Sequence, residues 1–78
     1  MYTVYVLIDK KGNFYKGVTN NIERRLREHQ SGKTRTTSKM SDLRIAYKEE
    51  FNNWDEARKK EVYFKTAAGR RFLKNKIR

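Results

Sequence analysis

The feature that most constrains how this chain folds is a glutamate in the middle of an otherwise apolar helical face. Residues 53–65 have the composition of a helix. At about 100° per residue, Glu61 falls on one stripe with Trp54, Ala57, Phe64 and Ala68. A buried, ionised carboxylate without a partner is strongly destabilising, so the sequence predicts a cation beside Glu61. The candidates are a metal ion, an arginine, or a lysine such as Lys65 at position i+4.

Length and residue usage limit what the chain can be. With 78 residues, it is expected to form one domain spanning residues 1–78. The absence of cysteine excludes disulfides, cysteine-based zinc sites and thiol catalysis. The apolar segments are too short to span a membrane, and no signal-peptide pattern opens the sequence. We therefore expect a soluble, intracellular protein located in the cytoplasm.

The charge of the chain points to a polyanionic partner. Lysine and arginine number 20 against 9 acidic residues, which gives a formal net charge of +11. A field of that sign on so small a domain attracts polyanions. Nucleic acid is favoured over an acidic protein, and over an anionic membrane because no helix pairs a basic face with a broad apolar one. Composition alone supports binding and carries no information about catalysis.

Two segments rich in β-branched and aromatic residues, 2–8 and 14–18, predict an antiparallel hairpin. A three-residue loop ending in a left-handed glycine pairs Tyr5 with Gly17. This register puts Tyr5 and Tyr15 on one face, as diagonal neighbours about 7–8 Å apart. A two-residue turn would place the tyrosines on opposite faces instead. The first register is favoured because the glycine leaves space beside Tyr5.

Three helices are predicted after the hairpin. Asn20 with Glu23, and Asn53 with Glu56, have the spacing of a capping box in which the asparagine is the N-cap. Gly69 is expected to interrupt the second of these helices. A short final helix then completes the core with Phe72, Leu73 and Ile77.

The segment between the first two helices predicts a loop and a strand. Residues 33–41 are basic and rich in Ser and Thr, which indicates a mobile loop able to contact phosphates. Leu43, Ile45 and Tyr47 alternate with other residues and predict a third strand ending near Phe51. The order is then strand, strand, helix, strand, helix, helix. It favours an α/β (α+β) fold with a small three-stranded, mainly antiparallel sheet flanked by helices.

Three polar features have residue types suited to phosphodiester cleavage: the tyrosine pair, Arg25 with His29 one turn apart on the flank of the first helix, and Glu61. A lone carboxylate can hold one Mg²⁺ that keeps positions for water and phosphate oxygens. An arginine can neutralise charge on a phosphate, and a Tyr or His can orient or deprotonate water. Each feature has a structural alternative. The tyrosines fit an ordinary sheet, Arg25 can extend to solvent, His29 can cap its helix, and Glu61 can pair with Lys65.

Four segments, in this order and spacing, resemble the GIY-YIG nuclease domain, the fold found in some intron homing endonucleases and in an excision-repair incision subunit. The two tyrosine motifs stand here as Thr3-Val4-Tyr5 and Tyr15-Lys16-Gly17. Residues 20–33 carry the arginine followed by histidine at i+4, and residues 61–65 resemble the later Glu-and-Lys segment. Residues 66–73 are similar to the ending of the short bacterial members. The resemblance covers almost the whole chain.

The resemblance implies a set of catalytic residues by position: Tyr5, Tyr15, Arg25, His29 and Glu61. In that family the tyrosines activate or position the attacking water, and the arginine contacts the scissile phosphate. The glutamate binds the metal, which implies Mg²⁺ or Mn²⁺ at Glu61 here. The chain departs from the family pattern at three positions that carry no catalytic side chain: Thr3, Lys16 and Val18. These departures affect the expected rate and substrate more than the reaction type.

The resemblance therefore implies an endonuclease that cuts DNA through one metal ion, with DNA repair as its setting. The residues expected to contact nucleic acid are Lys16, Arg24, Lys33, Arg35, Lys39 and Lys65. The alternative is a non-catalytic nucleic-acid-binding module that keeps the fold, and a purely structural domain would leave Glu61 without a role. No specificity module is recognisable in the sequence. Branched or nicked DNA, or a partner protein, are the candidates for what directs the activity.

Overall fold

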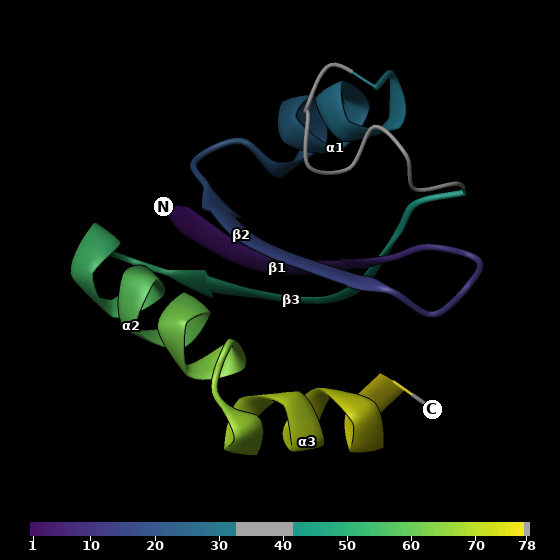
Figure 1. Ribbon diagram of the computed structural model, residues 1–78. Coiled ribbons are helices and arrows are strands. Elements are labelled where there is room, and N and C mark those ends of the chain that lie inside the picture. The colour runs from purple at the N-terminus through teal and green to yellow at the C-terminus, as the bar shows by residue number, and fades with distance from the viewer. Residues whose placement is uncertain (33–41, 78) are drawn as a thin grey trace.

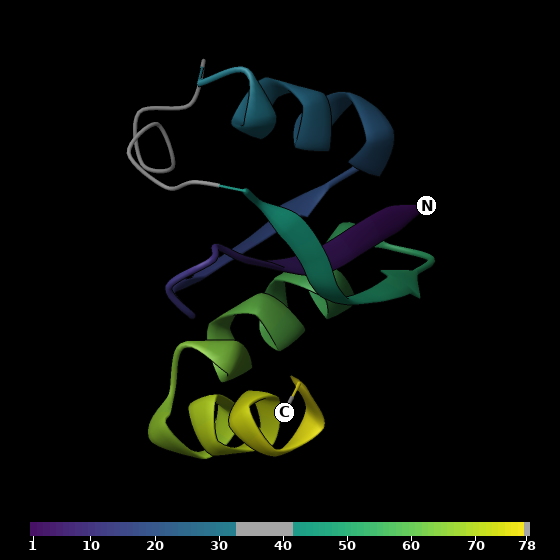
Figure 2. The same cartoon turned by 90° about the vertical axis from the view of Figure 1, so that its right-hand side faces the viewer.

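The computed structural model describes residues 1–32 and 42–77. Its elements, in chain order, are β1 (Tyr2–Ile8), β2 (Phe14–Thr19), α1 (Ile22–Gln30), β3 (Arg44–Phe51), α2 (Trp54–Phe64) and α3 (Ala67–Ile77). α1 covers one face of the sheet, while α2 and α3 cover the other (Figures 1 and 2). The element order and the antiparallel three-stranded sheet confirm the predicted fold class. None of the described helices is long and apolar enough to cross a membrane.

The sheet has β1 in the centre, with β2 and β3 antiparallel on either side. The hairpin has the predicted register, because Tyr5 lies opposite Gly17. Gly12 at the turn has a φ of +89°, a conformation that glycine adopts without a steric penalty. Tyr5 and Tyr15 consequently share one face, with their ring centroids 6.2 Å apart.

The third strand departs from the regular alternation that the sequence predicts. Tyr47 lies opposite Val6, but Ile45 lies opposite Leu7, so β3 contains one extra residue at this point. Such a β-bulge reverses the facing of the side chains beyond it. Tyr47 packs with Val6 under α2 and α3, whereas Ile45 packs with Leu7 under α1. The bulge therefore lets one strand supply apolar side chains to both cores.

α1 begins one residue later than predicted. The side chain of Asn21, and not of Asn20, is the N-cap and accepts a hydrogen bond from the backbone N–H three residues on. The Thr19 hydroxyl accepts the backbone N–H of Asn21 at 3.1 Å, which fixes the chain for this start. Glu23 is then the second helical residue, so the predicted capping box does not form, although its charge still suits the helix N-terminus. At the other end of α1, Gly32 has a φ of +79°, the left-handed conformation that suits the residue after a helix.

α2 begins at the predicted cap but is shorter than the predicted helix. Asn53 is the N-cap; its Oδ1 accepts the backbone N–H of Glu56 at 2.9 Å and its Nδ2 donates to the Glu56 carboxylate at 3.1 Å. Trp54, expected on the buried stripe, is 47% exposed. Ala68, also expected there, lies beyond the end of α2 at Phe64 and belongs to α3.

The interruption between the last two helices falls at Lys65 and Thr66, so the prediction of a break at Gly69 is wrong. Gly69 lies inside α3, buried against the end of α2. A Cβ built there would collide with the carbonyl oxygen of Tyr63 and would lie 2.7 Å from Cα of Phe64. The glycine is needed because two backbones approach closely, and it has no role in ending a helix.

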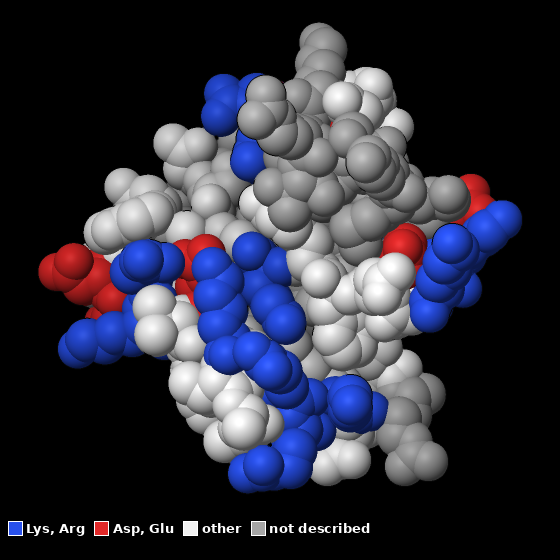
Figure 3. Space-filling model, in the orientation of Figure 1, with Lys and Arg blue, Asp and Glu red and all other residues white. Residues whose placement is uncertain are grey.

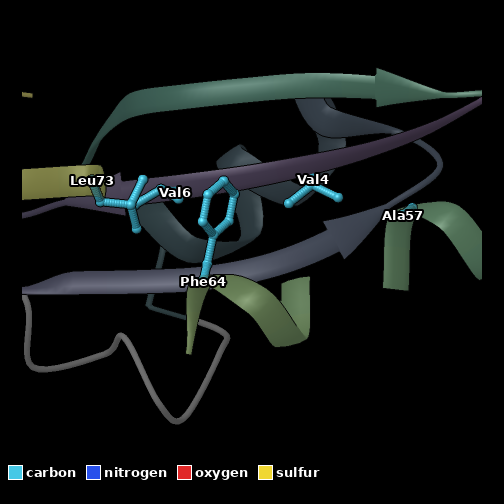
Figure 4. Packing of buried hydrophobic residues seen from close by; sticks show 5 residues of the cluster. All are labelled: Val4, Val6, Ala57, Phe64 and Leu73. Carbon is cyan, nitrogen blue, oxygen red and sulfur yellow. The ribbon is translucent and has the colours of Figure 1, made fainter. Parts of the chain in front are cut away.

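The core under α2 and α3 is built from five buried side chains: Val4, Val6, Ala57, Phe64 and Leu73. The Phe64 ring reaches between the two valines of β1 (Figure 4). Leu73 is fully buried and Ile77 packs at the edge, as predicted, but Phe72 is 37% exposed and stacks on Phe64. Burial of Ala57 and Phe64 fixes the rotation of α2, which in turn holds Glu61 between them on the buried side.

Candidate active site and nucleic-acid interface

The face of the sheet under α1 brings together four of the five residues that the sequence singled out: Tyr5, Tyr15, Arg25 and His29. The Tyr5 hydroxyl lies 3.0 Å from Nε2 of His29. The Tyr15 ring centroid is 4.7 Å from that of the His29 imidazole. The Arg25 guanidinium interacts with the hydroxyls of both tyrosines. The hairpin thus supplies the tyrosines, and successive turns of α1 supply the arginine and the histidine.

Gly17 makes room for the buried tyrosine of this group. It lies directly opposite Tyr5, and a Cβ at this position would lie 2.6 Å from the hydroxyl oxygen and 2.8 Å from Cζ of the ring. The ring therefore extends over the glycine backbone, which bears no side chain. In this position the Tyr5 hydroxyl reaches Nε2 of His29. The space that the sequence predicts beside Tyr5 is confirmed.

The charge states of Tyr5 and Arg25 are set by their surroundings. Tyr5 is only 1% exposed, and this burial raises its pKa to about 12, while the hydrogen bond from Arg25 acts in the opposite direction. The phenol is therefore protonated at neutral pH. The hydrogen bond to Tyr5, followed by the one to Glu28, raises the already high pKa of Arg25. Arg25 is a permanent cation.

His29 is neutral in the folded protein. Burial lowers its pKa below the ordinary value, and the charge of Arg25 lowers it further, while Glu28 acts in the opposite direction. Arginine can only donate hydrogen bonds, so its interaction with the Tyr5 oxygen favours the His29 tautomer in which Nε2 accepts the Tyr5 proton. The result is a directed hydrogen-bond chain from Arg25 through Tyr5 to His29.

Glu28 also belongs to this site, although the sequence reasoning did not single it out. Nη1 of Arg25 donates to Oε1 of Glu28 at 2.9 Å, and Nε of Arg24 lies 3.9 Å from the other carboxylate oxygen. Glu28 therefore supplies the anionic partner for an arginine that faces the core. The i,i+3 spacing from Arg25 was the signal in the sequence that could have identified it.

Glu61 lies in the other layer, on α2, with its side chain 10% exposed. Its Oε1 accepts a hydrogen bond from Nη1 of Arg58 at 2.8 Å, and its Oε2 accepts one from Nζ of Lys65 at 3.3 Å. The cation predicted beside Glu61 is thus present twice, and Arg58 at i−3 was missed. These two contacts are the polar contacts of Glu61 within residues 1–32 and 42–77. We refer to Tyr5, Tyr15, Arg25 and His29 as the Tyr5 group. That Glu61 acts together with the Tyr5 group stays a prediction.

A group of basic side chains lies around Glu61. Lys16 lies opposite Val6 in the sheet, so it points to the α2 side of β2. Burial lowers its pKa, and the nearby charges of Arg70 and Lys65 lower it further. Nη2 of Arg70 donates to the backbone carbonyl of Lys65 at 3.1 Å. We refer to Lys16, Arg58, Lys65 and Arg70 as the basic cluster.

Figure 3 shows that Lys and Arg side chains form a continuous band on the face in view, from its middle down to α3. Two members of the basic cluster, Arg58 and Arg70, were not among the predicted nucleic-acid contacts. Arg24, which was predicted, is exposed on α1. The remaining three predicted contacts lie outside the described residues: Lys33, Arg35 and Lys39.

Glu61 is the position at which the expected metal ion would bind. No three His, Cys, Asp or Glu side chains within the described ranges are grouped so as to hold a metal ion. Glu61 would therefore be a single protein ligand, which suits Mg²⁺ because this ion usually keeps several of its waters. Arg58 and Lys65 place positive charge directly on this carboxylate, so a metal ion would compete with them for its oxygens.

Comparison with known proteins gives a consistent result. The sequence model described as "GIY-YIG catalytic domain" matches residues 1–76. A UPF0213 protein of Limosilactobacillus reuteri is 39% identical over 67 residues, covering 82% of this chain and 70% of the relative. A UPF0213 protein of Bacillus licheniformis is 42% identical over 62 residues, covering 78% of this chain and 64% of the relative. The solution NMR structure of the UPF0213 protein BH0048 from Bacillus halodurans superimposes with a TM-score of 0.59 at 29% identity, over 96% of this chain and 84% of that one.

Proposed function

Because the chain belongs to the GIY-YIG catalytic domain family, we propose that it is a metal-dependent endonuclease that hydrolyses phosphodiester bonds in DNA with a single metal ion. The observation that carries this proposal is the hydrogen-bond chain from Arg25 through Tyr5 to His29. A structural role alone does not require a permanent cation, a buried phenol and a neutral imidazole in contact. Together they provide charge stabilisation and a proton acceptor, the two functions that hydrolysis of a phosphodiester needs.

Arg25 is proposed to bind the scissile phosphate. The Arg25 side chain is one-third exposed, so its guanidinium can reach a ligand while Glu28 and the tyrosines hold it in place. A planar guanidinium pairs with phosphate oxygens through two parallel hydrogen bonds. As negative charge grows on the phosphate during hydrolysis, this fixed cation stabilises it more strongly than water would.

The two tyrosines are proposed to have different tasks. Tyr15 is partly exposed and packs on His29, so it is placed to hold the attacking water. Tyr5 is buried, and its high pKa keeps the phenol protonated at neutral pH, so it cannot accept a proton without giving up its own. It can nevertheless pass a proton, because its hydroxyl lies 3.0 Å from Nε2 of His29, which can accept it in the corresponding tautomer. In this scheme His29 is the final acceptor of the proton that the water loses.

Glu61 is proposed to hold Mg²⁺ or Mn²⁺, which when bound would add Lewis-acid stabilisation of the phosphate. Tyr15 faces the α1 side of the edge strand β2, and its neighbour Lys16 faces the α2 side. A DNA backbone lying along this edge would meet the Tyr5 group on one side and the basic cluster on the other. Branched or nicked DNA, which exposes its backbone at a bend, suits such an edge better than a straight duplex.

One observation favours a second candidate, a nucleic-acid-binding module that lacks catalysis. Both oxygens of Glu61 are already engaged by Arg58 and Lys65, so its negative charge is balanced without a metal ion. In that case the basic cluster would hold a nucleic acid and Glu61 would only stabilise α2. The same experiment separates the two candidates.

The experiment compares cleavage and binding in Glu61→Gln and Arg25→Ala. Labelled flaps, nicked duplexes, branched junctions and linear duplex are incubated with Mg²⁺ or EDTA, and affinity is measured by fluorescence anisotropy. Glu61→Gln keeps the shape but loses the charge that a hard cation needs, so cleavage should fall by orders of magnitude while affinity holds or rises. Arg25→Ala should lose roughly 10²–10³ in rate, as other lost transition-state donors do, and some affinity as well.

The matched control is Glu50→Gln, the same charge change at an exposed position of β3. It should cleave as the unchanged protein does. Full Mg²⁺-dependent cleavage by a folded Glu61→Gln protein would refute the role of Glu61. Binding without any cleavage of the four DNA forms by the unchanged protein would favour the non-catalytic module.

A further inference from the structure

We propose that Arg58 and Lys65 exchange partners: they hold Glu61 in the free protein and turn to backbone phosphates when nucleic acid binds. The exchange would free the Glu61 carboxylate for a divalent cation, so that nucleic acid controls metal binding at this site. The inference rests on the proposed function and adds a regulatory step to it. It also assigns Arg58, on α2, to phosphate binding.

The first support is the unequal burial of the three side chains. The Glu61 side chain is 10% exposed, whereas those of Arg58 and Lys65 are 51% and 54% exposed. An exposed cation gains little from an ion pair and loses little by leaving it. A buried carboxylate is different, because leaving it without any cation is strongly unfavourable. The cations are therefore the replaceable partners, and the carboxylate must always have one.

The second support is the position of the two cations, Arg58 within α2 and Lys65 at its C-cap. Arg58 lies one turn before Glu61 and Lys65 one turn after it, so the pairs engage different oxygens of the carboxylate. A divalent cation on this carboxylate would lie next to two positive charges. Their repulsion disfavours metal binding in the free protein. Removing either cation from the carboxylate should relieve this.

The third support is the surroundings of Lys65. Arg70 is anchored on the Lys65 carbonyl, and Lys16 is close enough to both for their charges to act on it. This crowding of positive charge is relieved when a phosphate enters the cluster. Figure 3 shows a band of Lys and Arg side chains long enough for a nucleic-acid backbone to extend along it. By linkage, a phosphate that draws Lys65 away must raise the affinity of Glu61 for metal, and the metal must raise the affinity for phosphate.

The test measures binding of Mn²⁺ by electron paramagnetic resonance, with and without a short duplex carrying hydrolysis-resistant phosphorothioate linkages. The free Arg58→Gln/Lys65→Gln protein should bind Mn²⁺ about 10-fold more tightly than the unchanged protein, a typical size for coupling between sites. Adding the duplex should tighten Mn²⁺ binding by a similar factor in the unchanged protein and leave the double variant unaltered. Glu61→Gln serves as the blank for Mn²⁺ held by the duplex itself.

The charge-matched control is Lys59→Gln/Lys74→Gln, at exposed positions of α2 and α3 away from the Glu61 ion pairs. It should bind Mn²⁺ as the unchanged protein does. Equal Mn²⁺ affinity of the free double variant and the unchanged protein would overturn the exchange while leaving the proposed function intact. If Glu61→Gln binds as much Mn²⁺ as the unchanged protein, this would instead refute the metal role of Glu61. If circular dichroism shows the double variant unfolded, the single variants decide, each with an expected gain of about 3-fold.

Discussion

Replacing Gly17 by alanine tests how the buried part of the site is built. The backbone there has no positive φ, so alanine is allowed and the cost is steric. The new Cβ would lie 2.6 Å from the Tyr5 hydroxyl oxygen, which must move by about 0.8 Å to restore ordinary contact at 3.4 Å. The ring cannot move freely, because Tyr5 is 1% exposed and packs against Tyr15 and His29. A shift of this size disturbs its 3.0 Å hydrogen bond to His29.

The magnitude follows from three terms. Overpacking a buried site costs about 1–3 kcal/mol, and losing one buried hydrogen bond costs about 1 kcal/mol. Alanine restricts the unfolded chain more than glycine does, which stabilises the folded state by about 0.4–1 kcal/mol. We therefore expect Gly17→Ala to lower the free energy of unfolding by about 1–3.5 kcal/mol. Urea unfolding followed by circular dichroism should show a lower midpoint with an unchanged slope.

Repeating the substitution in a Tyr5→Phe protein isolates the contact between position 17 and the Tyr5 hydroxyl. In Tyr5→Phe the hydroxyl oxygen is gone, so Gly17→Ala should cost about 1 kcal/mol less there than in the unchanged protein. Gly12→Ala is the control, since nothing lies within 4 Å of its Cβ and its φ of +89° makes the cost purely conformational. That cost should be the same in both backgrounds. A Gly17→Ala protein with unchanged stability and an intact bond to His29 would refute the argument that the glycine accommodates Tyr5.

Three further predictions follow from other residues. Gly69→Ala places a Cβ against the backbone of Tyr63 and Phe64, and urea unfolding should show a loss of more than about 3 kcal/mol or no folded protein. His29, the single histidine, has a lowered pKa in the fold, so the unfolded state binds its proton more readily. Stability should be full above about pH 6.5 and fall as the pH drops through the folded pKa, and His29→Gln should remove this change. If about four to six phosphates are neutralised, the logarithm of the affinity for duplex DNA should fall linearly with the logarithm of the salt concentration, with a slope of about −4 to −5. Charge reversal at Lys33 and Lys39 should make this slope less steep. An affinity that does not depend on salt would contradict a nucleic-acid partner.

Sequence reasoning succeeded where the governing interactions are local. Turn chemistry and the opposed Gly17 were enough to predict the hairpin register, and with it the shared face of Tyr5 and Tyr15. Helical spacing put Arg25 and His29 on one flank, where the structure brings them to the tyrosines. These inferences depend on a few neighbouring residues and on the fixed periods of strands and helices. Distant parts of the chain change neither the turn chemistry nor these periods.

Glu61 shows how far such reasoning extends. Its place on a buried stripe required a cation, and the sequence could name Lys65 because i+4 spacing is a local property. Arg58 at i−3 obeys the same local spacing rule, so the sequence could have named it as well, although it was missed. What the sequence could not give is that both cations stay largely exposed while the carboxylate is buried.

The tertiary structure decided whatever depends on two segments meeting. The bulge in β3 sends Tyr47 and Ile45 to opposite faces, because both cores need apolar side chains and one strand supplies them. Gly69 lies inside α3 because the two helix backbones pack too closely for a Cβ. The raised pKa of Tyr5 and the lowered pKa of His29 exist only once the sheet and α1 exclude water from both. Desolvation is a property of the whole packed layer, so periodicity along one segment does not contain it.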